Sequence, residues 1–245
     1  MSIYNKITID KRANKKSFAL LIDPDKQDRE QLNTIIEKAE NANTDYFFVG
    51  GSLLTHDSLN VCLETLKEHS NIPVILFPGN AMQVNDKADG ILFLSLISGR
   101  NAEMLIGKQV ITAPILKKSS LEVLPTGYIL IDSGKPTTVS YMSNTSPIPA
   151  DKSSVAACTA MAGEMLGLKL IFMDGGSGAK IPISEKMIKT VSKSVDCPII
   201  IGGGINSGEK AIANCKAGAD IIVVGNAIEK DEDLIEEIAN AVHNY

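Results

Sequence analysis

The sequence predicts an α/β protein whose fold class is the TIM (β/α)8 barrel. Short apolar segments rich in β-branched residues recur along all 245 residues and alternate with segments of helical periodicity. Most of the short segments are apolar at every position, which is typical of parallel strands covered on both faces. Eight such repeats in about 250 residues match the size of a TIM barrel. Because no linker rich in Pro or Ser interrupts them, we expect one domain over residues 1–245.

The predicted strands are the apolar segments themselves, at residues 18–22, 46–49, 74–77, 91–94, 127–131, 170–173, 198–201 and 221–224. Stretches with apolar residues three and four positions apart predict helices at residues 27–41, 58–68, 152–166, 184–194, 207–217 and 229–242. This alternation predicts right-handed β-α-β units. The alternative is a doubly wound open sheet, but its G-x-G-x-x-G dinucleotide fingerprint is missing after the first strand.

Two connections depart from the regular repeat. Residues 78–90, between the third and fourth strands, leave little room for a regular helix, so we expect a gap there in the outer ring of helices. Residues 133–151 are rich in Ser, Thr and Pro. A connection of that length in a compact domain is either a functional lid or an added hairpin.

Composition and charge exclude several classes of protein. No apolar run reaches the roughly 18–20 residues that span a bilayer, and the polar start has no apolar signal region. We therefore expect a cytoplasmic protein with no transmembrane segment. The four scattered cysteines form no C-x-x-C pair and the three histidines do not cluster, which argues against disulfides and zinc. A net charge of −5 without a Lys/Arg block argues against a nucleic-acid partner.

Glycine turns follow the seventh and eighth strands, as Gly202-Gly203-Gly204 and Gly225-Asn226. Glycine permits a positive φ and lets backbone N–H groups approach an anion closely. In TIM barrels the loops after these two strands often bind phosphate. The sequence therefore predicts a phosphate site at this end of the barrel. The alternative is that the glycines only make tight turns.

The sixth strand ends in Asp174-Gly175-Gly176-Ser177-Gly178. A carboxylate at a strand end followed by a flexible loop suits a general base beside a bound anion. Ser177 and the amides of the loop are candidate phosphate donors. The alternative is that Asp174 only caps the following turn.

Carboxylates also follow the first strand, in Asp23-Pro24-Asp25-Lys26, and Gly50-Gly51-Ser52 follows the second. Two carboxylates at the mouth of a barrel suit Mg²⁺, which takes oxygen ligands and keeps several waters. For Asp25 the alternative is the N-cap of a helix that starts near Gln27. The segment Gly50–Ser52 offers close anion approach or a hydroxyl ligand.

Three other features carry weaker signals. His56 and Asp57 form either a catalytic pair or part of a helix cap. Arg100 reaches either an anion or a surface carboxylate. The pair Lys117-Lys118 is interpreted as part of a solvated face.

Together these motifs resemble the geranylgeranylglyceryl phosphate synthase family, which are prenyltransferases with a TIM barrel. The resemblance covers nearly the whole chain, and its specific parts are D-P-D-K and the G-S-G-A of the sixth loop. The matching segments are Asp23-Pro24-Asp25-Lys26, Gly50-Gly51-Ser52, Pro78-Gly79-Asn80, Phe172 to Ala179, Gly202 to Asn206, and Gly225-Asn226.

The resemblance implies Mg²⁺-dependent transfer of a polyprenyl group, typically geranylgeranyl, from its diphosphate to the C3 hydroxyl of sn-glycerol 1-phosphate. The product is an ether-lipid precursor for phospholipid biosynthesis. By position, the resemblance implies that Asp23 and Ser52 form the metal site and that Asp174 is the catalytic base. The implied glycerol phosphate site consists of Phe172, Met173, Asp174, Gly175, Gly176, Ser177, Gly178, Gly203, Gly204, Gly225 and Asn226.

The gap after the third strand matches an absent helix in the family, whose place opens a groove for the prenyl chain. We also expect a homo-oligomer, a dimer or an assembly of dimers. The family's Tyr-Leu-Glu on the sixth strand reads Phe172-Met173-Asp174 here. The chain thus lacks one phenol and has a carboxylate shorter by one methylene at the position of the base.

Two other functions remain as alternatives. A phosphosugar isomerase or aldolase would use the same phosphate turns. It would need either a lysine at a strand end for a Schiff base, which no predicted strand has, or a second carboxylate opposite Asp174, which Asp132 after the fifth strand could supply. A phosphate-binding subunit without catalytic activity would bind the ligand and not turn it over.

Overall fold

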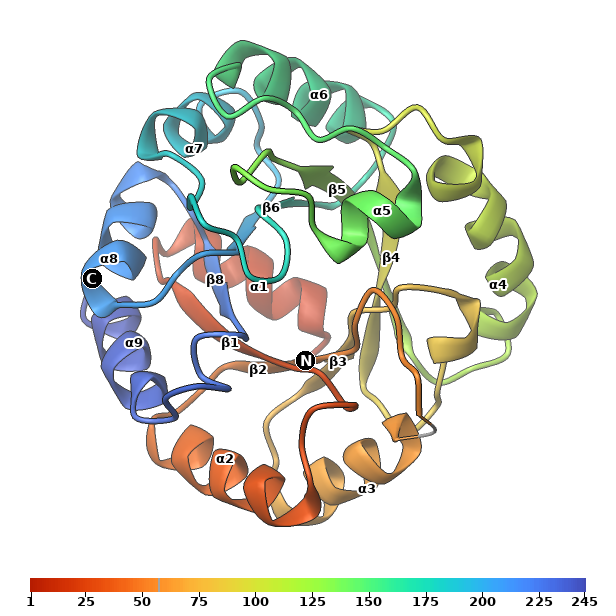
Figure 1. Cartoon of the computed structure of the whole chain (residues 1–245), viewed down its shortest axis with the longest axis vertical. Helices are drawn as coiled ribbons and strands as arrows, with labels where there is room; N and C mark the ends of the chain where they lie inside the picture. Colours follow the sequence, from red (N-terminus) through yellow and green to blue (C-terminus); the bar gives the residue numbers. More distant parts are fainter. Residues whose placement is uncertain (57) are drawn as a thin grey trace.

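Eight parallel strands form a closed barrel in the order of the sequence, which confirms the predicted TIM barrel (Figure 1). The computed structural model describes residues 1–56 and 58–245. The strands are β1 (Ser17–Ile22), β2 (Tyr46–Val49), β3 (Val74–Leu76), β4 (Gly90–Leu96), β5 (Glu122–Leu130), β6 (Leu170–Asp174), β7 (Ile199–Gly202) and β8 (Ile221–Val224). Each overlaps a predicted strand; β5 starts earlier because Glu122 to Thr126 also pair with β4.

Helices pack around the barrel and across its two ends (Figure 1). They are α1 (Ile3–Arg12), α2 (Arg29–Asn41), α3 (Leu59–His69), α4 (Lys108–Leu116), α5 (Thr138–Ser143), α6 (Ser153–Met165), α7 (Glu185–Ser192), α8 (Gly208–Ala217) and α9 (Leu234–His243). All six predicted helices are present, although α9 starts five residues later than predicted. The sequence analysis did not predict α1, α4 or α5.

Two apolar layers hold the barrel together. Side chains alternate along each strand, so neighbouring residues belong to different layers. Phe172 on β6 packs inside the barrel, whereas Met173 packs outward among the helices. The pairing of β5 with β6 sets Tyr128 beside Phe172 and Leu130 beside Asp174. This register brings the Tyr128 side chain next to the end of β6.

Helix α1 lies against the amino-terminal end of the barrel, opposite the carboxyl ends of the strands. Its first two amides, of Ile3 and Tyr4, donate to the Glu122 carboxylate at 2.6 and 2.8 Å. An anion at a helix N-terminus is stabilised by the helix dipole. Ile3 and Ile7 are buried against the inner layer of the barrel. This helix escaped prediction because only these two of its residues are buried.

The two irregular connections have distinct structures. Between β3 and β4 the chain forms one 3-10 turn, η1 (Ala81–Gln83), in place of a regular helix, as predicted. Residues 133–151 contain α5, and their single bridge, Ile131 with Ile148, is parallel. The hairpin alternative is therefore wrong. Figure 1 shows α5 over the mouth of the barrel, beside β4 and β5.

No helix in the described part of the chain is long and apolar enough to cross a membrane.

Candidate functional site

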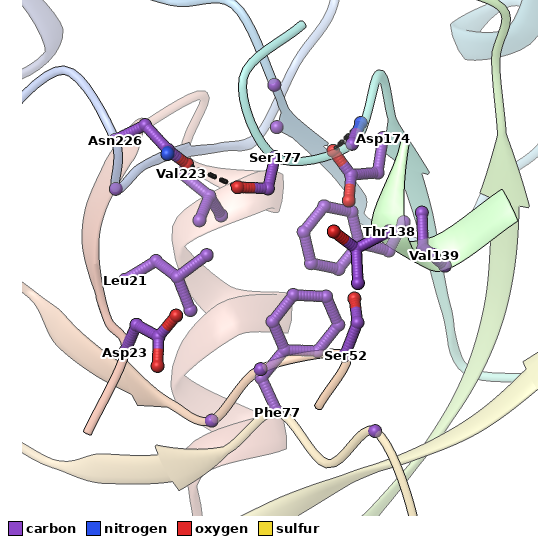
Figure 2. A pocket seen from close by; sticks show the side chains of 18 of the residues that line it. Leu21, Asp23, Ser52, Phe77, Thr138, Val139, Asp174, Ser177, Val223 and Asn226 are labelled. Carbon is purple, nitrogen blue, oxygen red and sulfur yellow. Dashed lines mark hydrogen bonds between the residues drawn. The ribbon is translucent and has the colours of Figure 1, made fainter. Parts of the chain in front are cut away.

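A cavity of about 960 Å³ opens at the carboxyl ends of the strands. Figure 2 shows one part of its wall formed by Asp174, Ser177 and Asn226, and another part formed by Asp23, Ser52 and Phe77. These residues come from the ends of β1, β2, β3, β6 and β8. The closed barrel therefore gathers most of the predicted site residues around one space.

Asp174, the last residue of β6, is 8% exposed. Its Oδ2 accepts a hydrogen bond of 2.5 Å from the Tyr128 hydroxyl, and its Oδ1 accepts one of 2.7 Å from the Gly176 amide. Burial raises the pKa of Asp174 above its ordinary value, against the opposing effect of these two hydrogen bonds. A carboxylate with a raised pKa binds a proton more readily, which suits a general base.

Asp174 does cap its turn, through the Gly176 amide. It also lines the cavity. The two readings of this residue are therefore compatible, because one oxygen fixes the loop and the carboxylate still faces the site.

The turn after β7 approaches Asp174 so closely that only glycine fits. Gly203 has a φ of +84°, and a Cβ there would lie 2.7 Å from the Gly175 nitrogen and 2.9 Å from Asp174 Oδ1. Gly176 has a φ of +82°, and its Cβ would crowd the Thr137 side chain. Bare backbone thus lines this part of the cavity, as the sequence predicts for an anion site.

The loops after β6 and β8 meet across the cavity. The Ser177 hydroxyl donates to Asn226 Oδ1 at 2.8 Å, a contact visible in Figure 2. Both side chains carry polar atoms that can turn to an anion. Gly204, Gly225 and Gly178 also line the cavity.

Met173 and Gly175 do not line the cavity. The Met173 side chain is fully buried between the barrel and the helices, because β6 alternates. Gly175 donates its amide to the Gly202 carbonyl at 3.1 Å. The structure therefore places these two expected ligand-contact residues outside the cavity wall.

Asp23 lies at the opposite side of the mouth, with its carboxylate 3.6 Å from the position of a Cβ on Gly51. It accepts a hydrogen bond from the Asp25 amide at 3.2 Å and lies 3.4 Å from Lys26 Nζ. The carboxylate is partly exposed and lines the cavity beside Ser52. One carboxylate and one hydroxyl fit Mg²⁺, which keeps several waters and binds substrate phosphates.

Asp25 has a different role from either one predicted. Its carboxylate accepts hydrogen bonds from the Ser58 hydroxyl at 2.6 Å and from the amide and hydroxyl of Thr55. These bonds outweigh burial and lower the pKa of Asp25 to about 2. The N-cap of α2 is Asp28, paired with Gln31 in a capping box. Asp25 thus joins the loops after β1 and β2 and leaves Asp23 as the carboxylate facing the cavity.

Gln83, a buried residue of η1, fixes the loops after β2 and β3 at the edge of the cavity. Gln83 Nε2 donates to the Gly51 carbonyl at 2.9 Å, and Gln83 Oε1 accepts from the Gly79 amide at 3.1 Å. A Cβ on Gly79 would collide with the Gly51 carbonyl. The loops after β2 and β3 are therefore locked together.

The cavity continues as an apolar groove along β4. Because η1 replaces a helix at this place, the outward-facing residues Ile91 and Phe93 of β4 line the cavity. Helix α4 and the segment before it form the other wall. The groove residues include Val84, Ile91, Phe93, Leu94, Met104 and Thr112.

Of the residues with weaker signals, His56, Arg100, Lys117 and Lys118 lie outside the cavity. His56 lies 75% exposed beside Asp25, and Asp57 lies outside the described residues. The Arg100 guanidinium donates to the carbonyls of its own loop, including Gly99 at 2.9 Å, and none of the described ion pairs joins it to a carboxylate. Lys117 and Lys118 follow α4 and are exposed, as expected.

Sequence reasoning missed several residues of the site. Tyr128 lies in the middle of a strand, and its contact with Asp174 depends on the register of two strands. Lys108 begins α4, lines the cavity and donates to the Gly79 carbonyl at 3.3 Å. Thr138 and Val139 of α5 cover another part of the wall. The length of residues 133–151 was the one available signal for α5.

A closed β/α barrel with a buried carboxylate and glycine turns at the carboxyl ends of its strands defines a TIM-barrel enzyme. Residues 10–242 match the model of the PcrB family. The chain is 58% identical over 241 residues to geranylgeranylglyceryl phosphate synthase of Chitinophaga pinensis, covering 98% of this chain and 96% of the relative. The chain therefore belongs to the PcrB family of geranylgeranylglyceryl phosphate synthases, which confirms the resemblance.

More distant relatives agree. The Methanothermobacter marburgensis protein of the same name is 39% identical over 93% of this chain and 94% of its own length. The crystal structure of the Thermoplasma acidophilum synthase in complex with its substrate sn-glycerol-1-phosphate superposes with a TM-score of 0.94 at 31% identity, covering both chains fully. A tryptophan synthase alpha chain from Legionella pneumophila, at 14% identity and a TM-score of 0.63, shares the fold alone.

Proposed function

We propose that the cavity transfers a polyprenyl group, geranylgeranyl in the first instance, from its diphosphate to the C3 hydroxyl of sn-glycerol 1-phosphate. The observation that carries this proposal is the continuity of the cavity. A glycine-lined anion site, a buried carboxylate, an acidic rim and an apolar groove open into the same space. Each matches one part of the two substrates.

The glycerol phosphate is assigned to the loops after β6, β7 and β8. Backbone amides at Ser177, Gly203 and Gly204, with the side chains of Ser177 and Asn226, are its proposed donors. Neutral donors of this kind bind a phosphate without a cluster of cationic side chains. This explains how an acidic chain can hold an anionic substrate.

The prenyl chain is assigned to the groove along β4. Its apolar side chains remove hydrocarbon from water, which favours binding by about 25 cal/mol for each Å² of apolar surface buried. The diphosphate head would then lie at the mouth between Asp23, Ser52 and Lys108. Lys108 has a backbone carbonyl as its hydrogen-bond partner, and no carboxylate of the described residues forms an ion pair with its ammonium group.

Asp23 and Ser52 are the residues that would hold Mg²⁺. The described residues contain no group of three or more His, Cys, Asp or Glu side chains that could enclose a metal. A site with few protein ligands fits an ion whose remaining ligands are water and substrate phosphate. When bound, Mg²⁺ would neutralise charge on the diphosphate and make it a better leaving group.

Asp174 is the proposed base. The glycerol C3 oxygen attacks the allylic carbon of the prenyl diphosphate, a C–O ether bond forms, and the bond from that carbon to the diphosphate oxygen breaks. The proton of the C3 hydroxyl passes to the Asp174 carboxylate. The raised pKa of this buried group favours its acceptance of the proton.

Release of diphosphate tests the proposal. We expect release with Mg²⁺, glycerol 1-phosphate and geranylgeranyl diphosphate together, and a return to background when any one is omitted or a chelator is added. Equal release without glycerol 1-phosphate would indicate a diphosphatase and overturn the proposed transfer.

The structure disfavours the isomerase or aldolase alternative. Asp132 does not line the cavity, and its Oδ1 accepts a hydrogen bond from the Gly134 amide at 2.9 Å. Asp132, the candidate for the second carboxylate, is therefore directed away from the cavity. The third alternative, a binding subunit, predicts stabilisation by glycerol 1-phosphate without any turnover.

A further inference from the structure

Tyr128 donates a hydrogen bond to Asp174, the proposed base. Its hydroxyl lies 2.5 Å from Asp174 Oδ2, and both residues are buried. Burial and the nearby Asp174 charge raise the pKa of Tyr128 well above its usual value, so the phenol keeps its proton and donates. The ring is held by Phe172 at 5.5 Å and Phe77 at 6.0 Å between ring centroids.

The hydrogen bond has few competitors. Asp174 has two hydrogen-bond partners in the described structure, Tyr128 and the Gly176 amide. On the side of β7 it faces the backbone of Gly202 and Gly203. The lysines of the cavity wall are Lys26, Lys108, Lys180, Lys210 and Lys230, and no described hydrogen bond or ion pair joins them to Asp174. The acids Asp23, Glu229 and Asp231 lie elsewhere on the wall.

We propose that Tyr128 is a positioning residue of the transfer reaction, whose hydroxyl orients the Asp174 carboxylate and favours its ionised form. This inference rests on the proposed role of Asp174 as the base. With Oδ2 held by Tyr128 of β5 and Oδ1 by Gly176 of the loop after β6, the plane of the carboxylate is fixed from two sides. A base must have its lone pair within hydrogen-bond reach of the proton that it removes.

The protonation state of Asp174 depends on the same hydrogen bond from Tyr128. A buried carboxylate without a cationic partner gains a proton easily, and donors to its ionised form oppose this. Tyr128 supplies one of the two donors. Removal of the phenol should therefore raise the pKa of Asp174 further, so that the carboxylate is protonated over a wider range of acidic pH.

The test compares Tyr128→Phe with Tyr46→Phe. Tyr46 is also fully buried inside the barrel, but its hydroxyl lies at the other end, 3.4 Å from Lys6 Nζ. Both variants lose one phenolic oxygen and keep the ring. In Tyr128→Phe we expect the acidic limb of the kcat/KM profile to move up by about one pH unit, a tenfold change in the protonation equilibrium. Tyr46→Phe should keep the wild-type limb.

A direct titration separates this inference from the proposed function. The carboxyl ¹³C resonance of Asp174, assigned through Asp174→Asn in a chain labelled at aspartate, reports its pKa without any substrate. We expect a higher pKa in Tyr128→Phe than in wild type or Tyr46→Phe. If wild type forms no prenyl product but the titration shifts, the proposed function fails and the Tyr128 contact stands.

An unchanged Asp174 titration in Tyr128→Phe would overturn the inference. Should that variant not fold, wild-type chain containing 3-fluorotyrosine replaces it, because the fluorinated phenol is a stronger donor. The Asp174 titration should then move to lower pH, and no movement would equally overturn the inference.

Discussion

At the scale of single residues, the site depends on a carboxylate that the barrel buries and then surrounds with donors. Asp174 could be predicted because it ends an apolar strand and precedes four small residues. Tyr128 could not, because its role follows from the pairing of Tyr128 with Phe172 across two strands. Asp25 was misassigned because the sequence does not show that Ser58 and Thr55 fold back onto it.

The Asp174 carboxylate accepts a hydrogen bond from the phenol of Tyr128 on the neighbouring strand β5. The sequence indicates that the sixth strand lacks a tyrosine, since position 172 is Phe. The structure places the Tyr128 hydroxyl of β5 on Asp174. A phenolic donor is therefore present at the proposed base although β6 does not supply it.

Loss of the carboxylate should abolish most of the activity. We expect Asp174→Ala to reduce kcat at least ~100-fold, since a positioned base contributes a factor of this size. Steady-state diphosphate release measures the effect. Because the alanine variant also removes a buried polar group, a thermal melt should accompany the assay. Full activity in a folded Asp174→Ala chain would remove this residue from the mechanism.

A glycine pair separates backbone strain from site geometry. Gly203 and Gly167 have φ values of +84° and +92°, but a Cβ on Gly167 would meet nothing within 4 Å. Alanine costs about 1 kcal/mol in this conformation at either position. We expect Gly203→Ala also to raise KM for glycerol 1-phosphate at least ~10-fold, because its Cβ would push on Asp174 and Gly175. Equal KM values for the two variants would contradict the assignment of this turn.

At the scale of elements, amphipathic helices between strands could be predicted, and less regular ones could not. α4 has no single apolar face, since Val110, Ile111 and Ile115 are exposed while Leu116 is buried. Helix α9 begins late because residues 229–233 are turns before the apolar face starts. The gap between β3 and β4 could be predicted from its length alone.

The last helix is fixed to the barrel by a largely buried carboxylate, that of Asp45. Asp45 accepts hydrogen bonds from His243 Nε2 of α9 at 2.8 Å and from the Phe18 amide of β1 at 3.0 Å. Lys6 of α1 lies 3.2 Å away. Burial would raise the pKa of Asp45, but these contacts outweigh it and lower the pKa below its ordinary value.

The free energy of unfolding should therefore decrease at acidic pH, because Asp45 becomes protonated. A carboxyl with a lowered folded pKa stabilises the fold above its unfolded pKa of about 3.9, and this contribution is lost as pH falls through the folded value. We expect Asp45→Asn to unfold more easily at pH 7 and to lose less stability than wild type between pH 5 and pH 3. Urea denaturation of both proteins across this pH range measures these differences. If the two proteins lost equal stability between pH 5 and pH 3, the role of Asp45 would be contradicted.

At the scale of the whole molecule, closure of the barrel explains how distant motifs form one site. Segments from residue 23 to residue 226 meet because the carboxyl ends of parallel strands share one edge. The sequence therefore predicts which motifs converge once the fold class is known. It does not predict the shape of the groove, which depends on side chains of β4 and α4 facing each other across the missing helix.

An exposed apolar surface on α4 is a candidate interface for the expected homo-oligomer. Ile106, Val110, Ile111 and Ile115, on α4 and the turn before it, are each more than half exposed. Contiguous exposed apolar surface is typical of protein interfaces. We expect Val110→Glu to lower the mass measured by sedimentation equilibrium relative to wild type, whereas Lys117→Glu should not. A monomeric wild-type chain at micromolar concentration would contradict the expectation.

Product analysis tests the central claim most directly, because it requires both halves of the cavity to act together. The chain is incubated with Mg²⁺, sn-glycerol 1-phosphate and a series of all-trans prenyl diphosphates of increasing length, and the products are identified by mass spectrometry. We predict a prenyl ether of glycerol phosphate, with geranylgeranyl diphosphate among the donors used, and no such product when sn-glycerol 3-phosphate replaces its mirror image. Absence of an ether product from every donor would contradict the account.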